Sequence, residues 1–436
     1  MAPTQTLRSE LYDDEEIRPW YEHARALVPR AALFDAHGHI GFNDPDGFTF
    51  SAEQLAATLT AADARGIAIP MHEPDGYPPA NDYVLEAAAA SDGRVVPFCR
   101  VDPKADPIGE AKRCLDAGAR GIKLHPRAEG FELSDPEVEP IFALAHERRL
   151  PILIHAGRGI PTLARDAVSL AGRYPEARVI LAHAAICDLN WIWRDAGRYP
   201  NLLFDTAWWH PTDLAALFAL IPPGQLVFGS DLPYFTPFMS STMAVRFGLQ
   251  VGLTPSQLAT ILGRQTERLL EGGEPIDVGP PAGTGRLGYS VLLERLTSVL
   301  TLAVGRMLMG RTGYEPLALA RLACDLGELH SRDAHVAKNV LALLHRQEQF
   351  VKENPGNGPP LGAGIRTIML AACVARTPDV PLPHVPELTE HHHVRAAARS
   401  GHRAFHETGI RRVEHPPADL ARSSAADHLI AEHHGH

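Results

Sequence analysis

Eight short apolar runs alternate with stretches of helical periodicity between residues 31 and 271, and this alternation limits the folds open to the chain. The strand-like runs lie at 32–40, 67–72, 95–101, 121–125, 151–155, 179–183, 202–206 and 226–230. The helical stretches lie at 53–65, 81–90, 108–117, 137–148, 163–173, 189–196, 212–220 and 255–271. Such alternation favours a parallel sheet covered by helices. Eight units in this span predict an α/β fold, a closed (β/α)₈ TIM-like barrel, whose usual length is ~250 residues.

A doubly wound open sheet is the structural alternative. That fold normally has a glycine-rich phosphate-binding turn directly after its first strand. In this chain the sequence His37-Gly38-His39 occupies that place. The first β/α turn therefore favours the barrel.

The first apolar run ends in two histidines, His37 and His39. Because side chains alternate along a strand, both point to the same face, with Asp35 behind them. Neutral imidazole is a favoured ligand of zinc and of other divalent metals. A pair of histidines alone is also typical of core packing, so the pair needs support from the rest of the chain.

Polar residues stand at or just past the ends of most other predicted strands. They are His72, Glu73, Arg100, Lys123, His125, His155, His183 and Asp231. In a (β/α)₈ barrel the catalytic groups lie at the C-terminal ends of the strands. The convergence of these side chains predicts a metal site with one position open to water.

The chain resembles the amidohydrolase superfamily, in the amidohydrolase-related (amidohydrolase 2) branch that includes aminocarboxymuconate-semialdehyde decarboxylase. Five motifs carry the resemblance, in the family's order, across residues 31–271. They are Phe34-Asp35-Ala36-His37-Gly38-His39, Gly121-Ile122-Lys123-Leu124-His125-Pro126, Ile152-Leu153-Ile154-His155-Ala156-Gly157, Ile180-Leu181-Ala182-His183-Ala184 and Phe228-Gly229-Ser230-Asp231-Leu232-Pro233. The resemblance does not extend beyond residue 280.

This resemblance implies that His37, His39 and His155 bind a metal ion and that Asp231 is a ligand, a proton acceptor or both. His183 would then orient the metal-bound water or polarise the substrate. A bound metal lowers the pKa of its water towards ~7. Asp231 can accept the proton and deliver it to the leaving group, and His183 can stabilise a developing oxyanion. Asp231 and His183 are therefore the predicted catalytic residues.

The number of metal ions depends on Lys123. In other amidohydrolase branches a lysine on the fourth strand is carboxylated and bridges two metals, and here His125 follows on the same face. We predict one divalent metal, zinc, over a binuclear site with carboxylated Lys123. Iron, manganese and nickel are the alternatives for the metal.

Four further residues are candidate substrate contacts. Arg158 could clamp a substrate carboxylate, and Trp208 and Trp209 could wall the pocket. His72 could support the site from the end of the second strand. For each of these residues, ordinary packing or a surface position is the alternative.

These residues predict a metal-dependent hydrolase that uses a metal-activated water on a small polar amide, ester or lactone. The first alternative is a metal-dependent non-oxidative decarboxylase on the same scaffold. The second is a catalytically inactive barrel that serves as a scaffold or interaction protein through C-terminal helices. The intact set of polar strand ends argues against the inactive barrel.

Composition shifts predict four segments along the chain. We expect an N-terminal arm (1–30), the amidohydrolase-like barrel (31–272), a helical extension (286–376) after a Gly/Pro-rich joint, and a Pro/His-rich tail (377–436). The tail has little apolar periodicity, so we expect it to be disordered. We expect the helical extension to be the route to any homo-oligomer.

Charge and cysteine content exclude some classes of protein. The net charge of -11 disfavours binding to nucleic acid. Five widely spaced cysteines indicate reduced thiols and a cytoplasmic location. The acidic first thirty residues do not resemble a signal peptide, and no stretch approaches the ~20 apolar residues of a membrane helix. The expected partner is a small-molecule substrate.

Overall fold

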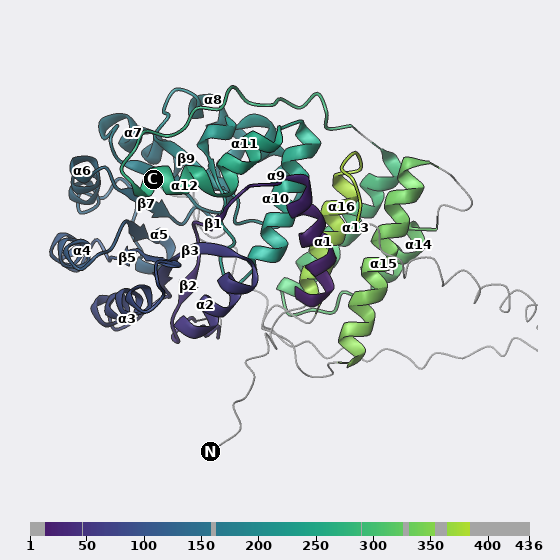
Figure 1. Ribbon diagram of the computed structural model, residues 1–436, viewed down its shortest axis with the longest axis horizontal. Coiled ribbons are helices and arrows are strands. Elements are labelled where there is room, and N and C mark those ends of the chain that lie inside the picture. Colours follow the sequence, from purple (N-terminus) through teal and green to yellow (C-terminus); the bar gives the residue numbers. More distant parts are fainter. Residues whose placement is uncertain are drawn as a thin grey trace, which may run out of the picture. The chain divides into compact units, whose positions relative to one another are not determined.

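A computed structural model describes residues 14–45, 47–157, 163–288, 290–325, 331–353 and 364–383 of the chain (Figure 1). All of these residues belong to one compact unit, Met1–Leu388. Arg158 and residues 384–436 of the predicted tail lie outside the described residues.

The strands form a barrel in which every paired strand runs parallel to its neighbour. They are β1 (Leu33–Asp35), β2 (His39–Ile40), β3 (Ala64–Pro70), β4 (Val95–Pro97), β5 (Cys99–Arg100), β6 (Ile122–Leu124), β7 (Pro151–Ile154), β8 (Arg178–Leu181), β9 (Leu202–Asp205) and β10 (Leu226–Val227). One sheet has the order β10-β9-β8-β7-β6-β5, and in the other β3 pairs with β1, β2 and β4.

Backbone hydrogen bonds join the two sheets at both seams. At one seam β4 continues through Phe98 into β5. The Phe98 N–H donates to the carbonyl of Ala68 (2.9 Å), so this strand stays bonded to β3. At the other seam the Ala36 N–H donates to the carbonyl of Phe228 (2.8 Å) and the Asp231 N–H to the carbonyl of His37 (2.7 Å). The segments β1 and β2 are two parts of one interrupted strand, and so are β4 and β5. The ten segments therefore form the eight strands of a closed barrel, as predicted.

The first strand differs from the predicted continuous run 32–40. It breaks between β1 and β2 because the His37 N–H turns to the side chain of Asp35 (3.1 Å) instead of to a neighbouring strand. The last predicted strand, 226–230, is also shorter, since only Leu226–Val227 pairs in the sheet. Both changes lie at the carboxyl ends of the strands.

Helices follow the strands around the barrel. They are α2 (Ala52–Ala61), α3 (Pro78–Ala89), α4 (Pro107–Asp116), α5 (Pro126–Glu129), α6 (Glu139–Arg148), α7 (Ala164–Arg173), α8 (Leu189–Ala196), α9 (Pro211–Leu220), α10 (Pro237–Val251), α11 (Pro255–Ala259) and α12 (Gln265–Leu270), with short turns η1 (His183–Ala185), η2 (Pro223–Gln225) and η3 (Thr260–Arg264). The predicted helix 255–271 is divided, since the π-helical turn η3 separates α11 from α12. Helix α10 and the N-terminal helix α1 (Asp14–Leu27) were not predicted from the sequence.

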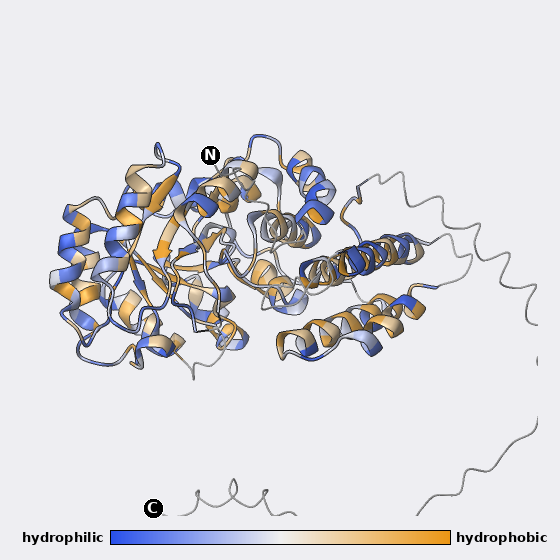
Figure 2. Cartoon of the chain, turned by 90° about the horizontal axis from the view of Figure 1, so that it is seen from below, coloured by the Kyte–Doolittle hydropathy of each residue, from blue (hydrophilic) through white to orange (hydrophobic). Residues whose placement is uncertain are grey.

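Apolar side chains fill the inside of the barrel. Phe34, Phe98 and Leu153 belong to this inner core, and a second, larger core lies between strands and helices. In Figure 2 the strands are largely orange, whereas the helices around them mix blue and orange residues. Because the interior is filled, polar groups can gather only at the ends of the barrel.

The chain beyond the barrel is helical, as predicted. It contains α13 (Val291–Leu308), α14 (Tyr314–Ala323), α15 (Arg332–Glu353) and α16 (Ile365–Arg376). Helix α16 is buried along its length from Ile365 to Ala375 and contacts α13, α15, α10, α9 and α1. A helix that is buried on all sides is typical of the core of a larger unit.

None of the helices among the described residues combines the length and the apolar character that crossing a bilayer requires.

We predict that a chain ending at residue 280 does not form a stable barrel. Every residue of α10 except Leu249 is buried, and α16 and α1 contact it. Removal of α16 would expose apolar surface, which costs about 25 cal/mol per Å². Size-exclusion chromatography and thermal unfolding should show aggregation or a loss of cooperative unfolding. A chain ending at residue 388 is the matched control, and a monomeric 1–280 fragment with the control's melting temperature would contradict the prediction.

Candidate metal centre

A pocket of about 400 Å³ lies at the carboxyl ends of the strands. It is lined by His39, Asp44, Pro45, Met71, His72, Arg100, Lys123, His125, Arg127, Ala128, His155, His183, Asp231 and Tyr234. A second pocket, of about 590 Å³, is lined by Arg25, Arg65, Glu267 and their neighbours. It contains none of the predicted site residues, so the chemistry belongs to the first pocket.

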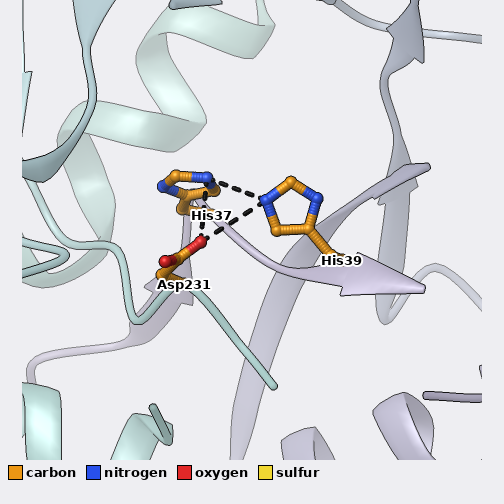
Figure 3. A group of neighbouring side chains, drawn as sticks. All are labelled: His37, His39 and Asp231. Atoms are coloured by element: carbon orange, nitrogen blue, oxygen red, sulfur yellow. Dashed lines mark hydrogen bonds and ion pairs between the residues drawn. The ribbon is translucent and has the colours of Figure 1, made fainter. Parts of the chain in front are cut away.

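Three buried side chains meet at this end of the barrel: His37, His39 and Asp231 (Figure 3). The two Nε2 atoms are 3.0 Å apart. The Asp231 Oδ1 lies 3.2 Å from the Nε2 of His37 and 3.4 Å from that of His39. Metal–ligand bonds of ~2.0–2.2 Å in a tetrahedral site separate the ligand atoms by roughly 3.3 Å. The spacing of the three atoms therefore fits a divalent metal ion.

The outer nitrogens of both histidines fix how the rings present their Nε2 atoms. The Nδ1 of His37 is 2.8 Å from the buried Asp205 carboxylate, and the Nδ1 of His39 is 3.4 Å from the Pro70 carbonyl. Since both partners are acceptors, Nδ1 carries the proton and the Nε2 lone pairs face each other and Asp231. Burial also lowers the pKa of both histidines well below the usual range. Neutral rings in this orientation are the form that binds metal.

The backbone holds Asp231 in an uncommon conformation. Its φ of 61° lies in the left-handed region, which non-glycine residues rarely adopt unless the surrounding structure holds them there. Its N–H donates to the His37 carbonyl (2.7 Å). Burial raises the pKa of the Asp231 carboxyl to about 6, so this group can exchange a proton near neutral pH.

Lys123 lies within the same group. Its Nζ is 3.1 Å from the Nε2 of His37, and the side chain is fully buried. Burial lowers the pKa of its ammonium group to about 8, and the nearby Asp231 opposes this change. Lys123 therefore contacts the lone pair that would bind a metal.

His155 and His183 form a neighbouring pair. The Nε2 of His183 is 2.9 Å from the Nδ1 of His155, and the His155 ring stacks on His125 at 3.9 Å between centroids. The Nδ1 of His183 is 3.0 Å from the Ala207 carbonyl and 3.8 Å from the Asp231 Oδ2. Burial lowers the pKa of His183. His155 is thus close to the three-residue group but is not one of its members.

The four predicted substrate contacts are placed differently. His72 lines the pocket. Trp208 lies edge-on to His183, with 6.3 Å between ring centroids, and its Nε1 donates to Asp213. Trp209 is buried in the outer core and is not among the pocket-lining residues. Arg158 lies outside the described residues.

Asp205, Tyr234 and Asp44 also belong to the site, although the sequence did not predict them. Asp205 ends β9 and, besides His37, accepts hydrogen bonds from the N–H groups of His183 (2.7 Å) and Ala207 (3.0 Å). Its position at the C-terminal end of a strand could have identified it, because the other site residues were predicted from that position. Tyr234 donates to Asp44 across the pocket; neither lies in a strand, and no pattern indicated their contact.

Comparison with known proteins gives a family and several distant structures. The family model for amidohydrolases matches residues 31–271. No curated protein matches the chain.

Solved structures similar to the chain include a probable 2-pyrone-4,6-dicarboxylic acid hydrolase from Acinetobacter baumannii with citric acid bound, which is 14% identical, with 55% of this chain and 99% of that chain covered and a TM-score of 0.41. They also include 4-oxalomesaconate hydratase from Rhodopseudomonas palustris, which is 17% identical, with 55% of this chain and 96% of that chain covered and a TM-score of 0.44. A third is dihydroxybenzoic acid decarboxylase from a Polaromonas species with manganese and 2-nitroresorcinol bound. It is 13% identical, with 55% of this chain and 97% of that chain covered and a TM-score of 0.44. The family assignment rests on the sequence match: residues 31–271 are more than half of the chain, and the protein belongs to the amidohydrolase family.

Proposed function

We propose that this amidohydrolase is a metal-dependent hydrolase that holds one divalent metal ion, zinc, at His37, His39 and Asp231. The observation that carries the proposal is the spacing of three buried donor atoms, 3.0 to 3.4 Å apart, beside a pocket of about 400 Å³. A pocket of this size accepts a small molecule. The proposed substrate is a small polar amide, ester or lactone.

The residues divide the work as follows. A bound divalent ion would supply a water of lowered pKa, near ~7. Asp231 accepts the proton of the attacking water and returns it to the leaving group, a role that suits a carboxyl with a pKa of about 6. His183, 3.8 Å from the Asp231 carboxylate, stabilises negative charge on the substrate oxygen. The ring of Trp208 limits the space beside His183.

His155 remains a proposed fourth ligand. It is hydrogen-bonded to His183 and stacked on His125, at the same pocket as the three-residue group. Among the described residues, one group of His, Cys, Asp or Glu donors has the spacing of a metal site. That finding supports a single ion over a binuclear site with carboxylated Lys123, in which His125 would assist.

Non-oxidative decarboxylation on the same residues is the alternative reaction. The same metal group would then hold the substrate, and Asp231 or His183 would deliver the proton.

A purely structural role through the C-terminal helices is the alternative outside catalysis. Exposed apolar residues on α13 and α14, such as Leu302 and Leu322 (55% and 70% exposed), support a proposed homo-oligomer through these helices. A cytoplasmic location also stays a prediction.

We predict that the full chain binds about one equivalent of zinc that the His37→Ala variant does not bind. Elemental analysis of both proteins measures this difference, and metal held by the His-rich tail cancels because both chains carry it. His146→Ala is the matched control, since His146 lies on α6 and bonds to the backbone of Glu176. Equal metal content in the His37→Ala variant would contradict the site, and a difference of two equivalents would favour the binuclear alternative.

We predict that Asp205→Asn weakens zinc binding roughly 10- to 100-fold, as expected when the partner of a ligating histidine is changed. The substitution removes the charge that holds the proton on the Nδ1 of His37. Competition with a chelator measures the affinity. Asp213→Asn is the control, because Asp213 lies in α9, the helix that follows β9, and accepts a hydrogen bond from Trp208 instead of from His37. An equal loss of zinc affinity in both variants would count against the role of Asp205.

We predict that His155→Ala and Asp231→Ala each abolish turnover while thermal unfolding shows a folded barrel. Loss of the proton acceptor alone should cost about 10²- to 10⁴-fold. The assay follows hydrolysis of simple esters, lactones and amides, and in parallel the release of carbon dioxide from aromatic and enoic acids. Carbon dioxide release without hydrolysis would favour the decarboxylase, and full activity in the Asp231→Ala variant would refute the assignment.

A further inference from the structure

An arginine of the C-terminal extension bonds directly to the loop that carries Asp231. Arg366 lies in the first turn of α16 and is 1% exposed. Its Nη2 donates to the carbonyl oxygens of Pro233 (3.2 Å) and Tyr234 (2.9 Å). These residues follow Asp231 by two and three positions. The extension therefore touches the candidate metal centre through the backbone of this loop.

The loop needs support on both sides. Asp231 has a positive φ, and such a conformation persists only where neighbouring groups hold it. On the barrel side, the Asp231 N–H donates to His37 (2.7 Å). On the other side, the Tyr234 N–H closes the turn by donating to the Asp231 carbonyl (2.9 Å). The bonds from Arg366 fix this second half of the turn, where Tyr234 also lines the pocket.

Helix α16 places the guanidinium group with little freedom. The helix is buried from Ile365 to Ala375 and is surrounded by α13, α15, α10, α9 and α1, as Figure 1 shows for its neighbours in the extension. A buried arginine is retained where its hydrogen bonds compensate for lost hydration. Arg366 directs two of these bonds to one short turn.

We propose that Arg366 is a positioning residue for Asp231, so that the extension, which lies outside the family match, sets the geometry of the metal-binding carboxylate. This inference rests on the proposed function. It assigns the extension a task at the metal centre without any contact between α16 and the metal or the substrate.

The chain offers a matched control in Arg246. This arginine is also 1% exposed, and it donates from α10 to Thr377 (2.9 and 3.0 Å) and to Pro381 (3.0 Å). It joins the barrel to the residues that directly follow α16 but does not bond to the Asp231 loop. Replacing either arginine by methionine removes a buried cation with several hydrogen bonds, so both variants should unfold at lower temperature than the wild type.

The experiment compares the full chain with its Arg366→Met, Arg366→Lys and Arg246→Met variants. Chelator competition measures the zinc dissociation constant, the visible spectrum of the Co²⁺-loaded protein reports the ligand geometry, and thermal unfolding reports stability. Arg366→Met should raise the zinc dissociation constant roughly tenfold and alter the Co²⁺ spectrum. Arg366→Lys should show a smaller change, because lysine keeps the charge but not the two-carbonyl geometry. Arg246→Met should lower stability and leave both metal readouts at the wild-type values.

Wild-type zinc affinity in the Arg366 variants, or an equal loss of affinity in Arg246→Met, would overturn the proposal. If Arg366→Met does not fold, the comparison of Arg366→Lys with Arg246→Lys decides it by the same readouts. A wild-type chain that binds no more metal than His37→Ala would instead overturn the proposed function, and this inference with it. The two failures are therefore distinct.

Discussion

The contact between the first and last strands is the constraint on which the candidate site depends. The Asp35 carboxylate accepts from the N–H of Ser230 (2.8 Å), from the hydroxyl of Ser230 and from the N–H of His37 (3.1 Å). Because it bonds to both sides, this buried side chain joins β1 to the segment after β10 and closes the barrel. It also interrupts the first strand at His37, and the interruption places His37 against Asp231. The same hydrogen bonds therefore close the barrel and bring the residues of the metal group together.

Burial determines the charge state of the site. Removal from water raises the pKa of Asp205 to about 7 and that of Asp231 to about 6, and it lowers the pKa of Lys123 to about 8. The histidines are held neutral for the same reason. Isolated charges in such a place are costly, and they are kept where they pair or bind a metal. Two buried carboxylates around two neutral imidazoles form a set of groups that a divalent cation would complete.

The barrel and the helical extension are not independent in this protein. The family match ends at residue 271, but α10 and α16 contact each other and both are buried. Arg246 and Arg366 bond across this contact in opposite directions, one from the barrel and one from the extension. The helices after the barrel therefore serve as part of its core, and their apolar sequences reflect that burial.

The sequence by itself determined the barrel, its strand order and most of the residues at the carboxyl ends of the strands. Alternating apolar runs report strand burial, and the rule that polar groups gather at one end of a barrel then selected His37, His39, Lys123, His155, His183 and Asp231. Only the tertiary structure decided which of these side chains meet. It brought His37, His39 and Asp231 together, set His155 beside His183, and added Asp205 and Arg366. Those contacts depend on backbone turns and on helices far away in the chain, such as the positive φ of Asp231 and the position of α16. Local sequence patterns carry no information about such distances, because the distances are set by packing between different strands, turns and helices of the folded chain.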